Sequence, residues 1–205
     1  MIVAFSGISG SGKSTMARLL AQRINAQAFI EPEEREWPLV VRKRDTYGAA
    51  TALLALRQGW ITQYVQADQA RSQGQLALID TYYFKTTSYY LDKPGMDWLM
   101  PTNDPYCPLI KNMFALDRTE YPDADRVVLF DIAFSDWQQL LKARGRAWDT
   151  PPGLYDLYVL TSTYIAQATE QHCAARGIPM LHFKQKCGNP DEQAVLLEQL
   201  VSSSY

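Results

Sequence analysis

Short runs of consecutive apolar residues alternate along the chain with longer segments of helical periodicity. Five such runs are typical of strands that are buried on both faces: residues 2–5, 28–30, 76–79, 127–130 and 180–183. Four longer segments have the apolar spacing of amphipathic helices: residues 13–24, 135–143, 154–175 and 190–201. Strands that alternate with helices in this way predict an α/β fold in which helices cover both faces of a parallel sheet.

Two remaining segments have weaker patterns. Residues 46–72 favour a long helix, with Gly59 as an expected break, because glycine is a poor helix former. Residues 92–125 are rich in Pro, Asp, Asn and Tyr, so we expect loops around one short helix near residues 109–116. The sequence has no internal repeat and no linker long enough to separate domains, and residues 1–205 are therefore expected to form a single domain.

Composition and charge narrow the class of protein. The 205 residues are 47% hydrophobic and 20% charged, as in ordinary globular domains, and the formal net charge is −2. A chain this close to neutral lacks the basic excess of a general nucleic-acid binder. No apolar stretch approaches the roughly 20 residues of a membrane span, and the N-terminus does not resemble a signal peptide. We therefore expect a cytoplasmic protein that binds neither polymeric nucleic acid nor membranes, with Cys107, Cys173 and Cys187 as reduced thiols.

Residues 7–15 carry the strongest chemical signal in the sequence. They satisfy the pattern GxxxxGK[ST] and lie between a predicted strand and a predicted helix. Glycines allow the backbone to turn its N–H groups toward a phosphate, and the helix that follows directs its positive end at the same anion. The pattern predicts a phosphate loop in which ATP is held by Gly7, Ser9, Gly10, Ser11, Gly12, Lys13, Ser14 and Thr15.

Magnesium and phosphate chemistry involves particular side chains. Within the loop, Lys13 is expected to reach the β- and γ-phosphates, and the Ser14 hydroxyl is expected to bind Mg²⁺. Asp80 ends the apolar run at 76–79, where a carboxylate can also reach the metal ion. Aspartate is common at strand ends because it favours turns, so its pairing with the phosphate loop, rather than the residue alone, supports this role.

Glu31 and two arginines are candidates for the transfer step. Glu31 follows the run at 28–30, so we expect it at the edge of the sheet where parallel strands meet ligands, in reach of an attacking hydroxyl. Arg144 and Arg146 flank a glycine after a predicted helix and can close over phosphates. The plain alternatives are a strand-end charge for Glu31 and helix-terminal cations for the arginines.

These residues together resemble the deoxyribonucleoside kinase and thymidylate kinase group of phosphate-loop enzymes. Besides the phosphate loop, the resemblance rests on Glu31-Pro32 with Trp37 shortly after, and on the stretch 125–146, which ends in Arg-Gly-Arg. It implies a three-layer α/β fold whose five parallel strands lie in the order 2-3-1-4-5. It also implies a short lid at about residues 142–152.

The resemblance also implies roles for individual residues. Glu31 would be the general base, and Arg144 and Arg146 would contact the transferred phosphate. Residues 60–71 resemble a Trp…Gln…Arg helix whose glutamine reads the base of the substrate. The implied substrate-binding residues are Glu31, Trp37, Gln63, Gln66 and Arg71. Spacing does not decide between the two glutamines, and a surface ion pair of Asp68 with Arg71 is an equal alternative for that arginine.

One departure from the family follows the third strand. The family's acid is followed there by an arginine that helps to hold phosphate, whereas Asp80 is followed by Thr81. Lys85 and Arg71 are the candidates for replacing that arginine.

The function expected from these residues is transfer of the ATP γ-phosphate to a hydroxyl of a small acceptor, with a (deoxy)nucleoside favoured and Mg²⁺ required. A nucleoside monophosphate kinase is the first alternative, because its acceptor needs an arginine cluster and the segment 35–44 carries three arginines and a lysine: Arg35, Arg42, Lys43 and Arg44. A non-catalytic ATP-binding regulator is the second, since the arginine after Asp80 is absent. Related kinases commonly dimerise through helices, so a homodimer is compatible with the resemblance.

Overall fold

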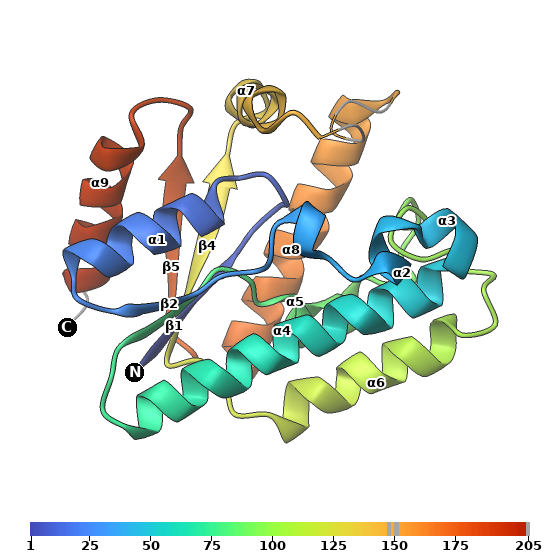
Figure 1. The fold of residues 1–205 in the computed structure, drawn as a ribbon, viewed down its shortest axis with the longest axis horizontal. Helices are drawn as coiled ribbons and strands as arrows, with labels where there is room; N and C mark the ends of the chain where they lie inside the picture. Colours follow the sequence, from blue (N-terminus) through green and yellow to red (C-terminus); the bar gives the residue numbers. More distant parts are fainter. Residues whose placement is uncertain (147–148, 150–151, 204–205) are drawn as a thin grey trace.

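A parallel five-stranded sheet forms the centre of the molecule. The computed structural model describes residues 1–146, 149 and 152–203. The strands lie in the order β2-β3-β1-β4-β5, and every pair is parallel (Figure 1). Their bounds are β1 (Ile2–Ser6), β2 (Gln27–Phe29), β3 (Ala77–Ile79), β4 (Arg126–Ile132) and β5 (Met180–Gln185). The fold class and the strand order expected from the sequence are confirmed.

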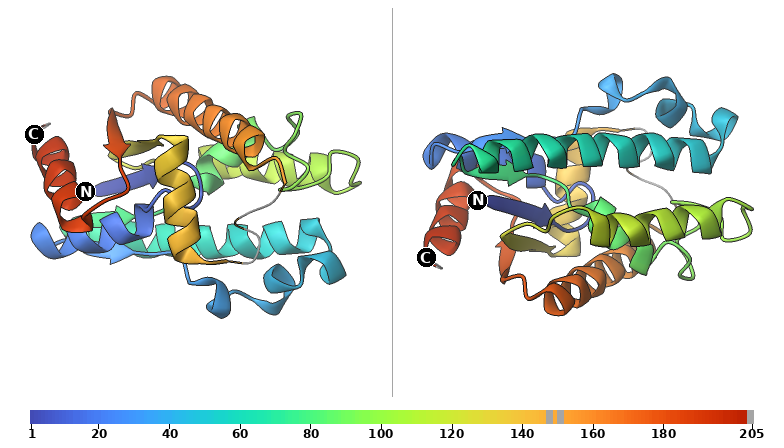
Figure 2. Two further views of the ribbon diagram at one scale, coloured as in Figure 1. Left: turned by 90° about the horizontal axis from the view of Figure 1, so that it is seen from above. Right: turned by 90° about the horizontal axis from the view of Figure 1, so that it is seen from below.

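Helices follow the strands and cover the sheet. The longer ones are α1 (Lys13–Arg23), α4 (Ala49–Ser72), α6 (Cys107–Glu120), α7 (Phe134–Arg144), α8 (Leu154–Arg176) and α9 (Pro190–Ser202). Short helical turns lie between them: η1 (Glu34–Glu36), α2 (Leu39–Arg42), α3 (Arg44–Tyr47), α5 (Tyr83–Thr86) and η2 (Thr87–Tyr89). The views in Figures 1 and 2 agree that α4 and α6 run side by side. Across the described part of the chain, none of the helices has the length and apolar character needed to cross a bilayer.

Two apolar layers, one on each face of the sheet, hold the fold together. Successive residues of a strand point to opposite faces, and β1 shows this directly. Val3 and Phe5 pack in the layer formed with α1 and α9, whereas Ile2 and Ala4 pack in the layer formed with α4, α6 and α8. Because β1 is buried on both faces, its carboxyl end emerges at the centre of the molecule, and this is where the phosphate loop begins.

The break expected at Gly59 is wrong, because α4 continues through this residue without interruption. The helix presents one buried face that includes Leu53, Trp60 and Tyr64, and burial of that face outweighs the weak helix propensity of a single glycine. In the segment 92–125, the one long helix is α6, which extends beyond the expected residues 109–116 at both ends.

Replacing Gly59 with alanine is expected to stabilise the protein by about 0.5–1 kcal/mol, because alanine has the higher helix propensity. A Cβ at this position meets nothing within 4 Å, so no neighbour has to move. Urea denaturation of Gly59→Ala should show a higher midpoint with an unchanged slope. Gly95→Ala is the opposing control, since Gly95 has φ +78 and its added Cβ would lie 2.4 Å from Leu160. An equal or lower midpoint for Gly59→Ala would contradict this interpretation of α4.

Candidate active site

The loop between β1 and α1 has the backbone of an anion cradle. Gly7, Gly10 and Gly12 have φ values of 139°, 82° and 84°, which side chains rarely permit. Space is also restricted, because a Cβ on Gly7 would lie 2.8 Å from the Phe130 carbonyl oxygen, and one on Gly10 would lie 2.5 Å from Leu141. Both glycines are therefore required by conformation and by contact.

A hydrogen bond from α7 supports the phosphate loop, and the Ser11 hydroxyl within the loop has no hydrogen-bond partner among the described residues. The Trp137 Nε1 donates a hydrogen bond to the Ser9 carbonyl oxygen at 2.8 Å. The Ser11 hydroxyl is buried. A polar atom left unpaired in a glycine cradle at the start of a helix fits the oxygen-rich phosphates of a nucleotide.

Lys13 lies at the first turn of α1 and is turned back onto the loop. Its Nζ donates to the carbonyl oxygens of Gly7 at 2.9 Å and Ile8 at 2.8 Å, and to the Tyr83 hydroxyl at 3.2 Å. Burial lowers the pKa of Lys13 to about 8, against the opposing effect of the Asp80 carboxylate. Anionic phosphates bound beside Lys13 would favour its charged form and so raise this lowered pKa again.

Ser14 and Asp80 meet as the sequence predicts. The Ser14 hydroxyl donates to one Asp80 carboxylate oxygen at 2.5 Å, and the backbone N–H of Glu31 donates to the other at 2.9 Å. Asp80 is 2% exposed, and burial raises its pKa, although the hydrogen bond from Ser14 opposes the rise. One hydroxyl and one carboxylate beside a phosphate cradle are the oxygen donors that Mg²⁺ takes at such sites.

Glu31 is oriented by a tryptophan of α4. The Trp60 Nε1 donates to its Oε1 at 3.0 Å. Burial raises the pKa of the Glu31 carboxyl, and the Trp60 hydrogen bond acts in the opposite direction. Since its own N–H binds Asp80, the structure brings Glu31 and the Ser14–Asp80 pair together at one edge of the sheet.

The two arginines predicted for the lid contact different parts of the chain. Arg144 forms a bidentate ion pair with Asp149, with Nε 2.9 Å from one oxygen, and its Nη1 lies 3.4 Å from the Ser9 hydroxyl. Arg146 pairs with Glu34 at 3.3 Å and lies 5.2 Å from the ring centre of Trp37. Positions 147–148 and 150–151 of the expected lid are outside the described residues.

The two candidate glutamines occupy different faces of α4. Gln63 is buried one turn after Trp60, and neither atom of its amide has a hydrogen-bond partner among the described residues. Gln66 is exposed and lines a shallow groove with Gln27 and Gln73. A buried amide without a partner is costly, and this distinguishes Gln63 from the exposed Gln66.

The structure does not bring Arg71 to the phosphate loop. Arg71 forms the i,i+3 ion pair with Asp68 and lies 3.6 Å from the Asp125 carboxylate. Asp125 in turn accepts a hydrogen bond from the backbone N–H of Ile2, at the amino end of β1. The phosphate loop begins at the other end of that strand, so Arg71 lies at the opposite edge of the sheet.

Lys85 does not take the place of the missing arginine either. Its side chain is fully buried, and its Nζ donates to the carbonyl oxygens of Arg118 at 3.1 Å and Tyr121 at 2.5 Å. It also pairs with Asp123 at 3.2 Å. These contacts hold α5 against the end of α6. Neither Lys85 nor Arg71 therefore replaces the family's arginine.

The arginines of segment 35–44, which could bind the phosphate of a monophosphate acceptor, contact other residues in this structure. Arg44 donates to the Leu99 carbonyl oxygen at 2.7 Å, and Arg42 donates to the Trp37 carbonyl oxygen at 3.1 Å. The highly exposed Arg35 lies 3.9 Å from Glu33. None of these three contacts is with a residue of the phosphate loop or with Asp80.

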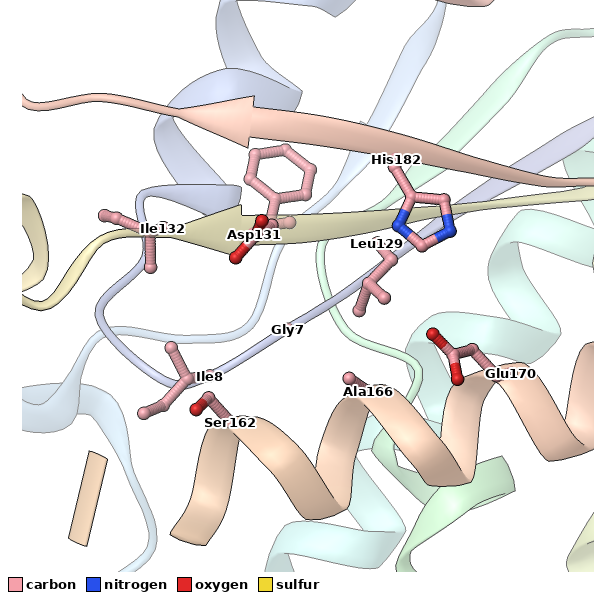
Figure 3. A pocket seen from close by; sticks show the side chains of 10 residues that line it. Gly7, Ile8, Leu129, Asp131, Ile132, Ser162, Ala166, Glu170 and His182 are labelled. Atoms are coloured by element: carbon pink, nitrogen blue, oxygen red, sulfur yellow. The ribbon is translucent and has the colours of Figure 1, made fainter. Parts of the chain in front are cut away.

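A separate cleft of about 260 Å³ lies between α8 and strands β4 and β5 (Figure 3). Its polar lining includes Asp131, Glu170 and His182, and Gly7 and Ile8 form one end of it. Of the residues predicted for the site, Gly7 alone lines this cleft. The phosphate loop, Asp80 and Glu31 instead meet at the carboxyl ends of β1, β2 and β3, whereas Arg71 and Gln66 lie away from them.

Two site residues were not assigned roles from the sequence. Trp60 holds Glu31, and the Tyr83 hydroxyl donates to the Gly7 carbonyl oxygen at 2.8 Å. The signal for Tyr83 lies in its spacing, three residues after Asp80, which places it beyond the end of β3 beside the phosphate loop.

The chain is similar in sequence to known nucleoside and nucleotide kinases. No family model matches the chain. It is 28% identical over 184 residues to a deoxyadenosine kinase of Lactobacillus acidophilus, covering 85% of this chain and 82% of that protein. It is 26% identical over 160 residues to a probable thymidylate kinase of Pyrococcus abyssi, covering 70% of each.

Two solved structures share the fold. A deoxyadenosine kinase from M. mycoides with bound dATP has a TM-score of 0.69 at 16% identity, covering 98% of this chain and 99% of that one. A thymidylate kinase from Candida albicans has a TM-score of 0.62 at 14% identity, covering 99% of this chain and 91% of that one. Both likenesses concern the fold.

Proposed function

We propose that the chain is a phosphotransferase like the deoxyadenosine and thymidylate kinases to which it is similar, and that it transfers the γ-phosphate of ATP to a hydroxyl of a (deoxy)nucleoside. The observation that carries this proposal is the hydrogen-bonded series from Ser14 through Asp80 to Glu31. It joins a phosphate-binding loop to a carboxylate that can accept the proton of an attacking hydroxyl.

The chain's own residues bind and orient the donor nucleotide. The loop glycines present backbone N–H groups, the Ser11 hydroxyl offers a free donor, and Lys13 exchanges its loop carbonyls for phosphate oxygens. Ser14 and Asp80 would hold Mg²⁺, which neutralises charge on the β- and γ-phosphates when it is bound.

Glu31 provides the base for the acceptor. The acceptor oxygen forms its bond to the γ-phosphorus as the bond from that phosphorus to the bridging oxygen breaks, and ADP leaves. The proton of the acceptor hydroxyl passes to the Glu31 carboxylate, whose orientation is fixed by Trp60. Arg144 and Arg146 then stabilise the charge on the transferred group from the lid side.

A nucleoside is the favoured acceptor for two reasons. The unpaired amide of Gln63 lies one helical turn from Trp60 and can pair with the polar edge of a base. Arg35, Arg42 and Arg44 contact residues outside the phosphate loop, whereas a monophosphate acceptor needs arginines beside the transferred group.

An acceptor panel tests the proposal. The protein is mixed with ATP and Mg²⁺ and with nucleosides, deoxynucleosides, their monophosphates or sugars, and ADP formation is followed. ADP is expected with at least one deoxynucleoside, and its formation should stop when EDTA removes the metal ion. Activity with a monophosphate and with no nucleoside would instead identify a monophosphate kinase. ATP that protects the fold without forming ADP with any acceptor would identify a regulator.

A further inference from the structure

Tyr83 occupies a central position that the proposed mechanism has not used. It is the first residue of α5 and is half-buried beside the phosphate loop. Its hydroxyl donates to the Gly7 carbonyl oxygen at 2.8 Å and accepts from Lys13 Nζ at 3.2 Å. Burial raises the pKa of Tyr83 well above its ordinary value, so the hydroxyl keeps the proton that it donates.

The ring of Tyr83 faces the other half of the site. It packs edge-on against Trp60, with ring centres 5.4 Å apart, and Trp60 in turn holds the Glu31 carboxylate. The Lys13 Nζ lies 5.4 Å from the centre of the Tyr83 ring. One side chain thus touches both the lysine of the phosphate loop and the tryptophan that orients the base.

The hydrogen bonds around Lys13 form a closed set. An ammonium group has three N–H donors, and here they meet the carbonyl oxygens of Gly7 and Ile8 and the hydroxyl of Tyr83. The Gly7 carbonyl oxygen uses its two lone pairs on Lys13 and Tyr83. The orientation of this peptide group, at the entrance of the loop, is therefore fixed from two sides.

We propose that Tyr83 is a positioning residue that fixes the entrance of the phosphate loop and Lys13 through its hydroxyl, and the Trp60–Glu31 pair through its ring. The first role concerns nucleotide binding at the loop, and the second rests on the proposed kinase function. Tyr83 thereby links the binding site for the phosphate donor to the base that serves the acceptor. It does so in a chain where the residue after Asp80 is a threonine instead of an arginine.

Tyr83→Phe separates the hydroxyl from the ring. Calorimetry with Mg²⁺-ATP and no acceptor is expected to show a Kd raised by roughly five- to tenfold, the effect of one lost hydrogen bond. In steady-state assays the KM for ATP should rise, while the KM for the acceptor should stay within about twofold because the ring still supports Trp60. Tyr83→Leu, which also removes the ring, should in addition lower kcat by about tenfold.

Tyr82→Phe is the matched control. The Tyr82 hydroxyl is a buried acceptor for the backbone N–H of Ala124, so its loss should lower the melting temperature and leave the Kd for ATP unchanged. A wild-type Kd for ATP in a folded Tyr83→Phe would overturn the role of the hydroxyl, and an unchanged kcat in a folded Tyr83→Leu would overturn the role of the ring. If the wild-type protein itself failed to bind ATP, the proposed function would fall instead.

Discussion

Lys13→Ala is expected to lower kcat/KM by on the order of a thousandfold while the protein remains folded. In this site Lys13 is the buried cation of the phosphate loop, and removing one charge-stabilising donor from such a position removes transition-state stabilisation. The fold should persist because both loop carbonyls keep a donor: Gly7 retains Tyr83, and Ile8 retains the backbone N–H of Ser11 at 3.3 Å. Steady-state kinetics and a circular dichroism melt measure the two effects.

Lys184→Ala is the control for Lys13→Ala. Lys184 is an exposed lysine of β5, so its loss tests whether activity depends on overall positive charge. We expect near wild-type turnover in this variant. If Lys13→Ala turned over at the wild-type rate, the role given to the loop lysine would be untenable.

Glu31→Gln is expected to lower kcat by 10²- to 10⁴-fold, the range of general-base catalysis, with little change in the Kd for ATP. The amide keeps an oxygen for the Trp60 N–H and keeps the backbone N–H that binds Asp80, so the geometry of the site is preserved. What the amide lacks is the capacity to accept the proton of the acceptor hydroxyl. Single-turnover measurements at saturating ATP isolate this step from nucleotide binding.

Glu36→Gln serves as the control for the second variant. Glu36 is exposed in η1, where it accepts a hydrogen bond from the backbone N–H of Glu33, and glutamine can accept the same bond. Its kcat should match the wild type. A fully active Glu31→Gln enzyme would remove Glu31 as the base.

The fold class, the strand order and the proximity of Ser14 to Asp80 could be predicted from local patterns in the sequence. The phosphate loop is a continuous motif, and both its turn and its helix are fixed by neighbouring residues. Asp80 is predictable because it ends an apolar strand in a chain that also has a phosphate loop, and the parallel pairing of β1 with β3 brings it to Ser14.

Positions along α4 required the geometry of the helix. A helix rises about 1.5 Å per residue, so the eleven positions from Trp60 to Arg71 span roughly 16 Å, enough to reach the opposite edge of the sheet. Gln63 shares the face of Trp60 because residues three apart are neighbours on a helix, whereas Gln66 has rotated to solvent. The sequence spacing places Gln63, Gln66 and Arg71 on one helix, but it does not show which face of that helix is buried against the sheet.

Tyr83 shows what the sequence could not supply. Its role comes from contacts with Gly7 and Trp60, which are 76 and 23 residues away in the chain, and those contacts exist only after β1, β3 and α4 have packed. The spacing after Asp80 places this tyrosine beyond the end of β3, but it does not say whether the ring joins the core or meets Lys13 and Trp60.

The contacts of α7 with the phosphate loop determine which part of the lid can move. Trp137 is bonded to Ser9, and Leu141 packs so closely on Gly10 that no side chain fits there, which makes α7 and the loop one rigid body. A hinge for the arginines must then lie after this helix. Gly145 has φ +69 and an added Cβ there would meet nothing within 4 Å, so the backbone is free to turn between Arg144, which contacts Ser9, and Arg146, which pairs with Glu34. The two arginines therefore have different surroundings: Arg144 contacts the phosphate loop that α7 holds, whereas Arg146 contacts the segment that follows β2.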